Sequence, residues 1–591
     1  MIKILMKQIG QYKRDTILTP VFTGLEVLLE ILIPFITAKI IDEGIEAGNM
    51  TRVYQYGLLM LVMAALSLVC GYLAGAFAAR ASSGFACNLR DSMYESIQTY
   101  SFSNIDKFST AGLVTRMTTD VTNLQNAFQM IIRIAVRSPL MLIVSMVMCL
   151  VINARLSLIF VAAILVLGCI LFFIMTRTTK IFDQVFSKYD DLNASVQENV
   201  TAIRVVKAFV REDYENEKFT RAAQNLYRLF VKAEKILTYN NPAMMLVVYG
   251  CILALSWFGA RFVTAGSLTT GELTSMFSYV MSILMSLMML SMIFVMVTMS
   301  GASAKRIVQV LTEKPDLANP AKPVMEIPDG RIDFNHVSFS YKSAQTDLTQ
   351  ERKYALQDID LHIRSGETIG IIGGTGCGKS SLVNLVSRLY DVDQGSVCVG
   401  GRNVKEYDME TLRNQVAVVL QKNVLFSGTI LENLRWGNEN ATEEECRQAC
   451  IQACADEFVS QFPDGYNTYI EQGGTNVSGG QKQRLCIARA LLKKPKVLIL
   501  DDSTSAVDTA TDASIRAAFT KSIPGTTKLI IAQRISSVEG ADRILVLDEG
   551  RISGFGTHEE LLKTNEIYRD IYETQMNAGG DFDHQTAERR A

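Results

Sequence analysis

Charged residues are scarce in this chain of 591 residues, at 20% of the sequence, and they are unevenly spread. Most of them follow residue 320, whereas residues 17–300 carry long apolar runs. A chain of this length is too long for one hydrophobic core, so it divides into at least two domains. We predict that one domain lies in a membrane and that the other lies in the cytosol.

An excess of basic residues is also missing, because 58 Lys and Arg stand against 60 Asp and Glu. A surface that binds nucleic acid normally shows as such an excess. We therefore set nucleic acid aside as a partner. The 11 cysteines are odd in number and repeat no pair spacing, which argues against a disulfide framework and fits a reducing compartment.

Six apolar segments are each long enough to cross a hydrocarbon core, which takes about 20 helical residues. They are residues 17–40, 57–79, 134–153, 156–176, 241–264 and 272–300. The long connections after the second and fourth segments hold the basic residues, so we expect them and both termini to be cytoplasmic. Their few Gly and Pro predict helices that extend beyond the membrane.

Carboxylates and thioethers inside these spans define a candidate substrate cavity. Glu26 and Glu30 lie one helical turn apart in the first span, where a charge usually faces a cavity or a partner. One helix face of the last span carries Met281, Met285, Met288, Met292, Met296 and Met299. Two interpretations stay open: structural hydrogen bonds and core packing, or a soft lining that accepts varied apolar ligands.

After a linker at residues 313–330, short strands alternate with helices, which is typical of the α/β class. A strand at Thr368–Ile372 leads into the pattern G-x-x-x-x-G-K-S and then into a helix. The pattern comprises Gly373, Gly374, Thr375, Gly376, Cys377, Gly378, Lys379 and Ser380, and Ser381 follows it. Backbone N–H groups of such a loop wrap phosphates, Lys379 neutralises phosphate oxygens and Ser380 offers an oxygen to Mg²⁺. ATP and Mg²⁺ are therefore the predicted ligands.

A second strand candidate, Val497–Leu500, ends in Asp501, whose carboxylate is expected to hold Mg²⁺ through water. Between this strand and the phosphate loop lies a segment that reads Val477, Ser478, Gly479, Gly480 and Gln481. With this signature the chain resembles the ABC transporter family, exporter type, over nearly its whole length. The signature helix offers an anion site that its own phosphate loop cannot use at the same time.

The resemblance implies a multidomain fold in three parts. An all-α, six-span membrane domain is expected at residues 1–312 and an α/β P-loop ATPase domain at residues 331–575. Residues 576–591 are rich in Gly and charge, and we expect them to form a disordered tail. The resemblance also implies that the signature caps an ATP molecule held by a second subunit.

Further residues acquire expected functions from the same resemblance. Tyr341 matches the aromatic residue that stacks on adenine, Gln421 the glutamine that contacts Mg²⁺, and Asp508 a loop that communicates across the dimer. The stretches Gly112–Asp120 and Thr201–Glu212 resemble coupling helices, the second of which docks on the partner's ATPase domain. A longer and more polar turn than is usual in the family, Lys342–Lys353, is expected to be a solvated loop.

Two positions depart from the family pattern where hydrolysis takes place. Asp502 replaces the glutamate that positions the attacking water, and its carboxylate reaches about 1.5 Å less far. Gln533 replaces the switch histidine, and an amide cannot take or share a proton as imidazole does. Together these changes resemble the degenerate-site subunit of bacterial heterodimeric multidrug exporters.

The expected function is an ATP-driven half-transporter in the plasma membrane that exports drug-like or lipid-like amphiphiles. Its partner is then a second subunit that holds the hydrolytically competent site. A lipid or peptide exporter, a homodimer with two slow sites and a nucleotide-gated channel stay open as alternatives.

Overall fold

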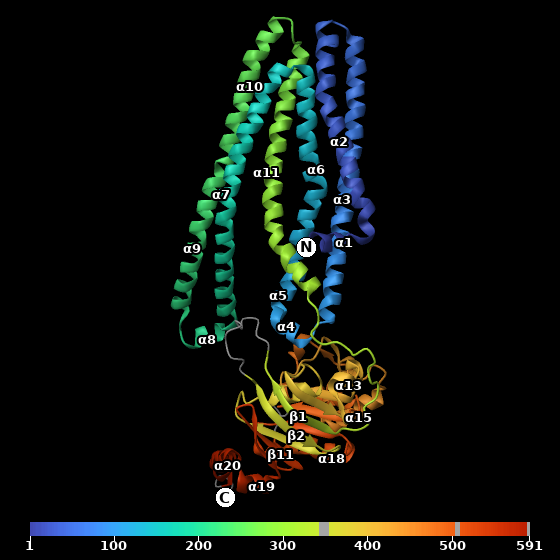
Figure 1. Cartoon of the computed structure of the whole chain (residues 1–591), viewed down its shortest axis with the longest axis vertical. Coiled ribbons are helices and arrows are strands. Elements are labelled where there is room, and N and C mark those ends of the chain that lie inside the picture. Colours follow the sequence, from blue (N-terminus) through green and yellow to red (C-terminus); the bar gives the residue numbers. More distant parts are fainter. Residues whose placement is uncertain (342–353, 503–508, 588–591) are drawn as a thin grey trace. The chain divides into compact units, whose positions relative to one another are not determined.

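The computed structural model describes residues 1–341, 354–502 and 509–587. The chain divides into two compact units (Figure 1). The N-terminal unit comprises Met1–Gln98 and Thr110–Glu313, and the C-terminal unit comprises Thr99–Ser109 and Lys314–Ala591.

Helices alone build the N-terminal unit. They are α1 (Ile2–Lys7), η1 (Gly10–Tyr12), α2 (Lys13–Lys39), η2 (Ile40–Glu46), α3 (Met50–Gln98), α5 (Thr110–Thr115), η3 (Arg116–Asp120), α6 (Val121–Ile152), α7 (Ala154–Thr201), α8 (Ile203–Ala208), α9 (Glu212–Thr238), α10 (Asn240–Thr264) and α11 (Thr270–Thr312). Within the described residues, six helical segments are long and apolar enough to cross a membrane, and each coincides with one predicted span. The six-span prediction is confirmed.

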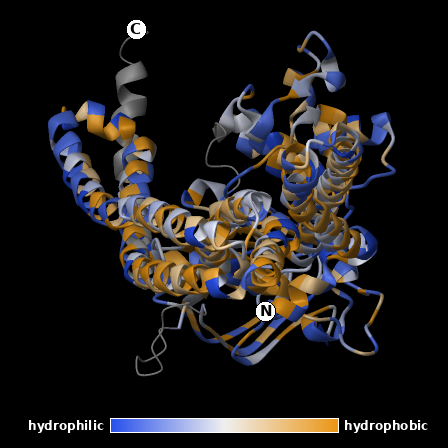
Figure 2. Cartoon of the chain, turned by 90° about the horizontal axis from the view of Figure 1, so that it is seen from above, coloured by the Kyte–Doolittle hydropathy of each residue, from blue (hydrophilic) through white to orange (hydrophobic). Residues whose placement is uncertain are grey.

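Large apolar side chains cover the outer surface of these helices. On α3, Leu58, Leu61 and Leu68 are 66%, 67% and 75% exposed. In water such a continuous apolar surface would cause association, whereas in a bilayer it faces hydrocarbon. Figure 2 shows hydrophobic residues along much of the length of the helices of this unit.

Hydrogen bonds from side chains join helices that lie far apart in the sequence. The hydroxyl of buried Tyr279 on α11 donates to the Ile31 carbonyl of α2 at 2.9 Å. Asp120 is buried and accepts hydrogen bonds from Arg306 Nε at 2.7 Å and Ser303 Oγ at 2.8 Å. These bonds fix the position of α11 against α2 and η3.

Helix α7 extends well beyond its span and turns through α8 into α9 (Figure 1). Near this turn, Asn199 Nδ2 donates to Glu215 Oε2 at 3.0 Å, and Lys218 Nζ bonds Glu198 Oε2 at 2.9 Å. The connection predicted to be a helical extension is therefore a pair of packed helices.

Strands and short helices alternate in the C-terminal unit. Its strands are β1 (Ile332–Phe339), β2 (Leu356–Ile363), β3 (Thr368–Gly373), β4 (Gln394–Val399), β5 (Arg402–Asn403), β6 (Val416–Val419), β7 (Gly428–Thr429), β8 (Tyr469–Ile470), β9 (Val497–Asp501), β10 (Thr527–Ile531), β11 (Arg543–Asp548) and β12 (Arg551–Gly556). Its helices are α4 (Phe102–Phe108), α12 (Lys379–Val386), η4 (Val404–Glu406), α13 (Met409–Gln415), α14 (Ile430–Arg435), α15 (Glu443–Gln452), α16 (Asp456–Val459), η5 (Gly465–Asn467), η6 (Gln472–Gly474), α17 (Gly479–Leu491), α18 (Thr509–Ser522), η7 (Ile535–Ser537), α19 (His558–Thr564) and α20 (Glu566–Ala587).

The central sheet has the strand order β12-β11-β3-β10-β9-β6, in which only the β11–β12 pair is antiparallel. A second sheet, β2-β1-β4-β5, is antiparallel. Every residue of β9 and β10 is buried, as expected for central parallel strands. The carboxyl ends of β3, β10, β9 and β6 therefore lie next to one another along one edge of the sheet.

Helix α4 belongs to the C-terminal unit although it lies between two membrane-unit helices in the sequence. Tyr390 donates its hydroxyl to Asp106 Oδ2 at 2.9 Å, and its ring lies 6.2 Å from that of Phe102. The predicted coupling stretch Gly112–Asp120 belongs instead to the N-terminal unit. Helix α4 thus packs within the C-terminal unit, and the coupling function of Gly112–Asp120 stays a prediction.

Candidate functional site

The phosphate loop connects the carboxyl end of β3 to the start of α12, as predicted. Gly378 has a φ of +99°, and a Cβ there would lie 2.6 Å from the Ala355 carbonyl oxygen, so only glycine fits. Gly374, Thr375 and Gly376 form the exposed tip of the loop. Cys377 is buried beneath this tip, so its side chain serves as packing.

Lys379 and Ser380 follow the tip at the start of α12. Lys379 Nζ donates to the carbonyls of Gly373 and Gly374 at 2.8 and 2.7 Å, which holds its ammonium group across the mouth of the loop. The loop thus combines backbone N–H groups, one cation and a helix N-terminus, which together can bind a chain of phosphates.

Asp501 ends β9 and faces this loop. Ser380 Oγ donates to Asp501 Oδ1 at 3.1 Å, so two of the three residues predicted to contact Mg²⁺ are in contact with each other. Burial raises the pKa of the Asp501 carboxyl, the Asp502 carboxylate adds to the rise, and the Ser380 hydrogen bond opposes it. One hydroxyl and one carboxylate oxygen are hard ligands of the kind that Mg²⁺ prefers, so this donor set fits the ion.

Asp502, Gln533 and Gln421 form a cluster of hydrogen-bonded side chains that we name the DQQ cluster. Gln533 Nε2 donates to Asp502 Oδ2 at 2.6 Å, and Gln421 Nε2 donates to the same oxygen at 3.4 Å. Asp502 is buried and has a φ of +47°, a left-handed conformation that Asp tolerates better than most residues. The three residues follow β9, β10 and β6, which explains their convergence.

Two further glutamines, not predicted from the sequence, hold the backbone of this cluster. Gln483 of α17 is buried and donates to the Asp502 carbonyl at 3.3 Å. Gln575 of α20 donates to the Gln533 carbonyl at 2.8 Å and accepts from the Ile535 N–H at 2.9 Å. No local motif marks either residue, because both act through contacts that are distant in the sequence.

Tyr341 lies beside the phosphate loop and is 47% exposed. Its hydroxyl is 2.9 Å from Ser381 Oγ on α12, and its ring packs edge-on against those of Phe339 and Tyr390, at 4.9 and 5.2 Å. An exposed ring next to a phosphate site can stack on a base. Asp508 and the loop Lys342–Lys353 lie outside the described residues.

The signature segment opens α17. Ser478 Oγ accepts a hydrogen bond from the Gln481 N–H at 3.2 Å, and Gln481 Oε1 accepts from the Ser478 N–H at 2.9 Å. This capping box leaves the N–H groups of Gly479 and Gly480 in the first turn of a helix of 13 residues, where an anion is favoured. Val477 precedes the cap and is half-buried.

The membrane candidates meet around a cavity of about 270 Å³ between α2, α6 and α11. Its lining comprises Glu30, Arg137, Ser138, Met141, Met281, Ser282, Met285, Ser286 and Met289. Of the predicted residues, Glu30, Met281 and Met285 belong to the lining. Glu26, Met288 and Met292 do not, and Met289 of α11, which was not among the predicted residues, does.

Arg137 is the residue of this region that the sequence reasoning missed. Its guanidinium lies between the two predicted carboxylates: Nη1 bonds Glu26 Oε1, and Nη2 bonds Glu30 Oε2 at 2.6 Å. The sequence did contain a signal for Arg137, because burying an arginine within the third span costs as much free energy as burying a glutamate within the first. Opposite charges in two spans predict an ion pair between those spans.

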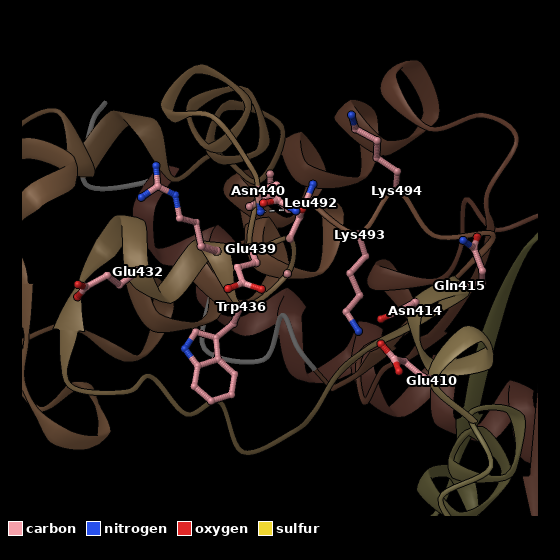
Figure 3. Close-up of a pocket in the computed structure, with 13 residues that line it drawn as sticks. Glu410, Asn414, Gln415, Glu432, Trp436, Glu439, Asn440, Leu492, Lys493 and Lys494 are labelled. Carbon is pink, nitrogen blue, oxygen red and sulfur yellow. Dashed lines mark hydrogen bonds between the residues drawn. The ribbon is translucent and has the colours of Figure 1, made fainter. Parts of the chain in front are cut away.

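A separate surface cavity of about 850 Å³ lies in the C-terminal unit (Figure 3). Trp436, Glu439 and Lys493 contribute to its lining, and Trp436 is also part of an adjoining cavity of about 350 Å³. In that second cavity the ring of Phe426 stacks on Trp436 at 4.2 Å, and both rings are exposed. This aromatic pair forms an open apolar surface next to β6 and Gln421.

Six spans joined to a P-loop domain with a signature helix define an ATP-binding transporter with fused domains. Family comparison agrees: the ABC transporter transmembrane region matches residues 16–307, and the ABC transporter ATPase region, described as "ABC transporter", matches residues 356–505. The chain belongs to the ABC transporter family, and it is an exporter-type multi-pass membrane protein that carries an ABC ATPase domain.

Relatives extend over nearly the whole chain. The uncharacterized ABC transporter ATP-binding protein YfiB of Bacillus subtilis is 36% identical over 555 residues, which are 94% of this chain and 95% of YfiB. An ATP-dependent lipid A-core flippase of Hahella chejuensis is 31% identical over 513 residues, 87% of this chain and 86% of that protein. A bacterial Atm1-family ABC exporter solved with ATP bound has the same fold, with a TM-score of 0.80, 23% identity and coverage of 96% and 98%.

Replacing Gly378 by alanine tests the phosphate loop. A left-handed φ costs a side chain about 1–2 kcal/mol, and the close Ala355 carbonyl adds to this cost, so we expect nucleotide affinity to fall at least about tenfold. Binding of a fluorescent ATP analogue measures the effect. Gly525→Ala is the control, because a Cβ there meets nothing within 4 Å. Equal affinities for the two variants, with unchanged melting temperatures, would contradict the assignment.

Proposed function

We propose that this chain is one half of a heterodimeric exporter of amphiphiles in a bacterial plasma membrane, and that its own nucleotide site hydrolyses ATP slowly. The observation that carries this proposal is the DQQ cluster. Its only carboxylate, Asp502, is short and accepts hydrogen bonds from two amides. Neither amide can accept a proton from the attacking water or return it to product.

The shorter reach of the Asp502 carboxylate is enough to slow ATP hydrolysis. A carboxylate displaced by about 1 Å from its working position costs roughly 10²-fold in rate. ATP binding does not depend on this carboxylate, because the phosphate loop, Ser380 and Asp501 are complete. When Mg²⁺ is bound, it neutralises phosphate charge, and Ser380 and Asp501 are the residues that would hold it. This chain's own site is therefore expected to bind ATP normally and to hydrolyse it slowly.

The intact signature supports the pairing with a second subunit. Ser478, Gly479 and Gly480 present a capped helix N-terminus on a surface that the chain's own phosphate loop does not use, so we assign this helix end to ATP held by the partner. The partner then carries the glutamate and the histidine that this chain lacks. ATP binding closes the two ATPase domains, hydrolysis reopens them, and the spans alternate between two states.

The turn between α7 and α9 is our candidate for coupling to the partner's ATPase domain. Val205, Phe209 and Val210 are exposed there, a costly arrangement for a free apolar tip in water. The aromatic pair Phe426 and Trp436 is a surface of matching chemistry. We infer that each subunit's turn packs on the corresponding aromatic pair of the other.

The membrane cavity supports amphiphiles as the substrate class, because charged groups and flexible thioethers line it together. Lipid translocation is a second candidate, supported by the relatives that are named lipid A-core flippases.

Restoring the family residues tests the slow site. In the assembled pair, removal of the partner's catalytic glutamate should reduce hydrolysis to the slow rate of this chain's own site. Adding Asp502→Glu together with Gln533→His to this chain should then raise turnover by about 10²-fold, because reach and a proton acceptor return. ATPase rates measure this, and Asp502→Asn is the control. Fast hydrolysis by this chain alone, as a homodimer by size, would contradict the proposal.

Substituting Ser478→Ala tests the shared site. Loss of a ligand to transition-state charge costs about 10²-fold or more, so hydrolysis by the assembled pair should fall steeply. The same change also removes a helix cap, worth about 1 kcal/mol. Thr442→Ala removes an equivalent capping box from α15 and controls for that effect. If both variants slow hydrolysis equally, the signature has no special function.

The coupling turn is tested by Phe209→Asp. A charge within an apolar contact should weaken docking, so the ATPase rate of the assembled pair should fall severalfold while binding of ATP to this chain persists. Tyr227→Asp, at a similarly exposed aromatic residue on α9, is the matched control and should have little effect. Equal rates for both variants would exclude the turn as a docking element.

A further inference from the structure

The ion cluster of the membrane cavity holds unequal numbers of positive and negative groups. One guanidinium, that of Arg137, lies between two carboxylates, and this leaves one negative charge in excess. The two carboxylates differ in accessibility: Glu26 is 12% exposed and does not line the cavity, whereas Glu30 is 39% exposed and does. The excess charge is therefore available on Glu30.

Arg133, one helical turn before Arg137, is the other cation nearby. Its guanidinium lies against Gly75 of α3, where Nη1 is 3.4 Å from the position of a Cβ on that glycine. It does not belong to the cavity lining. The lining itself therefore presents one carboxylate and one guanidinium, and the guanidinium is already paired with a second, more deeply buried carboxylate.

A buried hydroxyl of the lining adds an independent sign of a ligand. Ser138 is 2% exposed, and its Oγ has no hydrogen-bond partner among the described residues. Glu26 Oε2 is likewise buried without a partner. Buried polar atoms are normally satisfied, so the unpaired Ser138 hydroxyl of the lining indicates that a polar group can enter the cavity.

The remaining lining is suited to a short apolar segment. Met141, Met281, Met285 and Met289 present four flexible thioethers from α6 and α11. The volume of about 270 Å³ lies below the range of sites that enclose a whole drug-sized molecule. The cavity therefore fits a head group and the first carbons of a chain, with the rest of the molecule outside.

We propose that this cavity binds the cationic head group of an amphiphile, with Glu30 as the residue that selects for positive charge. The inference rests on the proposed export of amphiphiles and names their charge. On binding, the ammonium group replaces Arg137 at Glu30, while Arg137 keeps its bond to Glu26. Glu30 thus exchanges one cationic partner for another, the added cation neutralises the excess negative charge, and no carboxylate is left unpaired in the membrane.

Two ligands of equal chain length and opposite charge test this selectivity: radiolabelled decyltrimethylammonium and decyl sulfate, below their micellar concentrations. Equilibrium dialysis against the full chain in lipid nanodiscs, with empty nanodiscs as baseline, measures binding without nucleotide. The wild-type chain should bind the ammonium ligand at least about tenfold more tightly than the sulfate. Glu30→Gln should remove this preference, and Glu30→Asp should retain it.

Glu95→Gln, an exposed carboxylate on α3, is the control and should leave binding unchanged. Ser282→Lys places a cation in the lining and should reverse the preference, which tests the idea even if Glu30→Gln destabilises the protein. Equal binding of the two ligands by the wild type, or an unchanged preference in Glu30→Gln, would overturn the inference.

A separate measurement, ATP-driven transport across a vesicle membrane, tests the export proposal. If binding is selective but the assembled pair does not move the ammonium ligand across the vesicle membrane when ATP is added, amphiphile export is refuted and the binding site remains. If the pair exports other amphiphiles while binding shows no charge preference, export remains and the assignment of Glu30 is wrong.

Discussion

The parallel pairing of β3, β10, β9 and β6 is the constraint on which the nucleotide site depends. Each strand is buried, and its hydrogen bonds set the register to the residue, so the chain segments that follow the four strands must emerge together. Those segments carry Lys379, Gln533, Asp501 with Asp502, and Gln421. Residues as far apart in the sequence as Ser380 and Asp501, 121 positions, thus reach hydrogen-bond distance because of main-chain pairing, not because of their own attraction.

Local patterns were sufficient to predict much of the fold. Six spans follow from apolar length alone, and the phosphate loop follows from glycines that permit one backbone path between a strand and a helix. Ser478 was recognisable as the start of a helix because a capping box needs only residues three apart. The order of the strands in the sheet could not be predicted from local patterns, because it depends on pairing between distant segments. Contacts such as Gln575 to Gln533, or Tyr341 to Ser381, therefore could not be predicted.

The rotation of a helix about its own axis was the second feature that the sequence could not predict. The spacing of the methionines on α11 predicts that they share a face, but a wide apolar face does not fix how the helix is rotated about its axis. Packing against α2, fixed by Tyr279, decides that Met281, Met285 and Met289 line the cavity. In contrast, Arg137 could have been predicted as the partner of Glu26 and Glu30, because a charge in one span calls for an opposite charge in another.

The carboxylate of the nucleotide site, Asp502, and that of the membrane cavity, Glu30, have different hydrogen-bond partners, and this difference bears on function. Asp502 accepts hydrogen bonds from two amides that carry no charge. Glu30 is held by an arginine that has a second carboxylate to return to, so its partner is replaceable. A buried ion pair contributes little net stability, because desolvation offsets attraction. In our proposal this ion cluster serves cation exchange: a ligand that binds without leaving an unpaired charge can also leave without one.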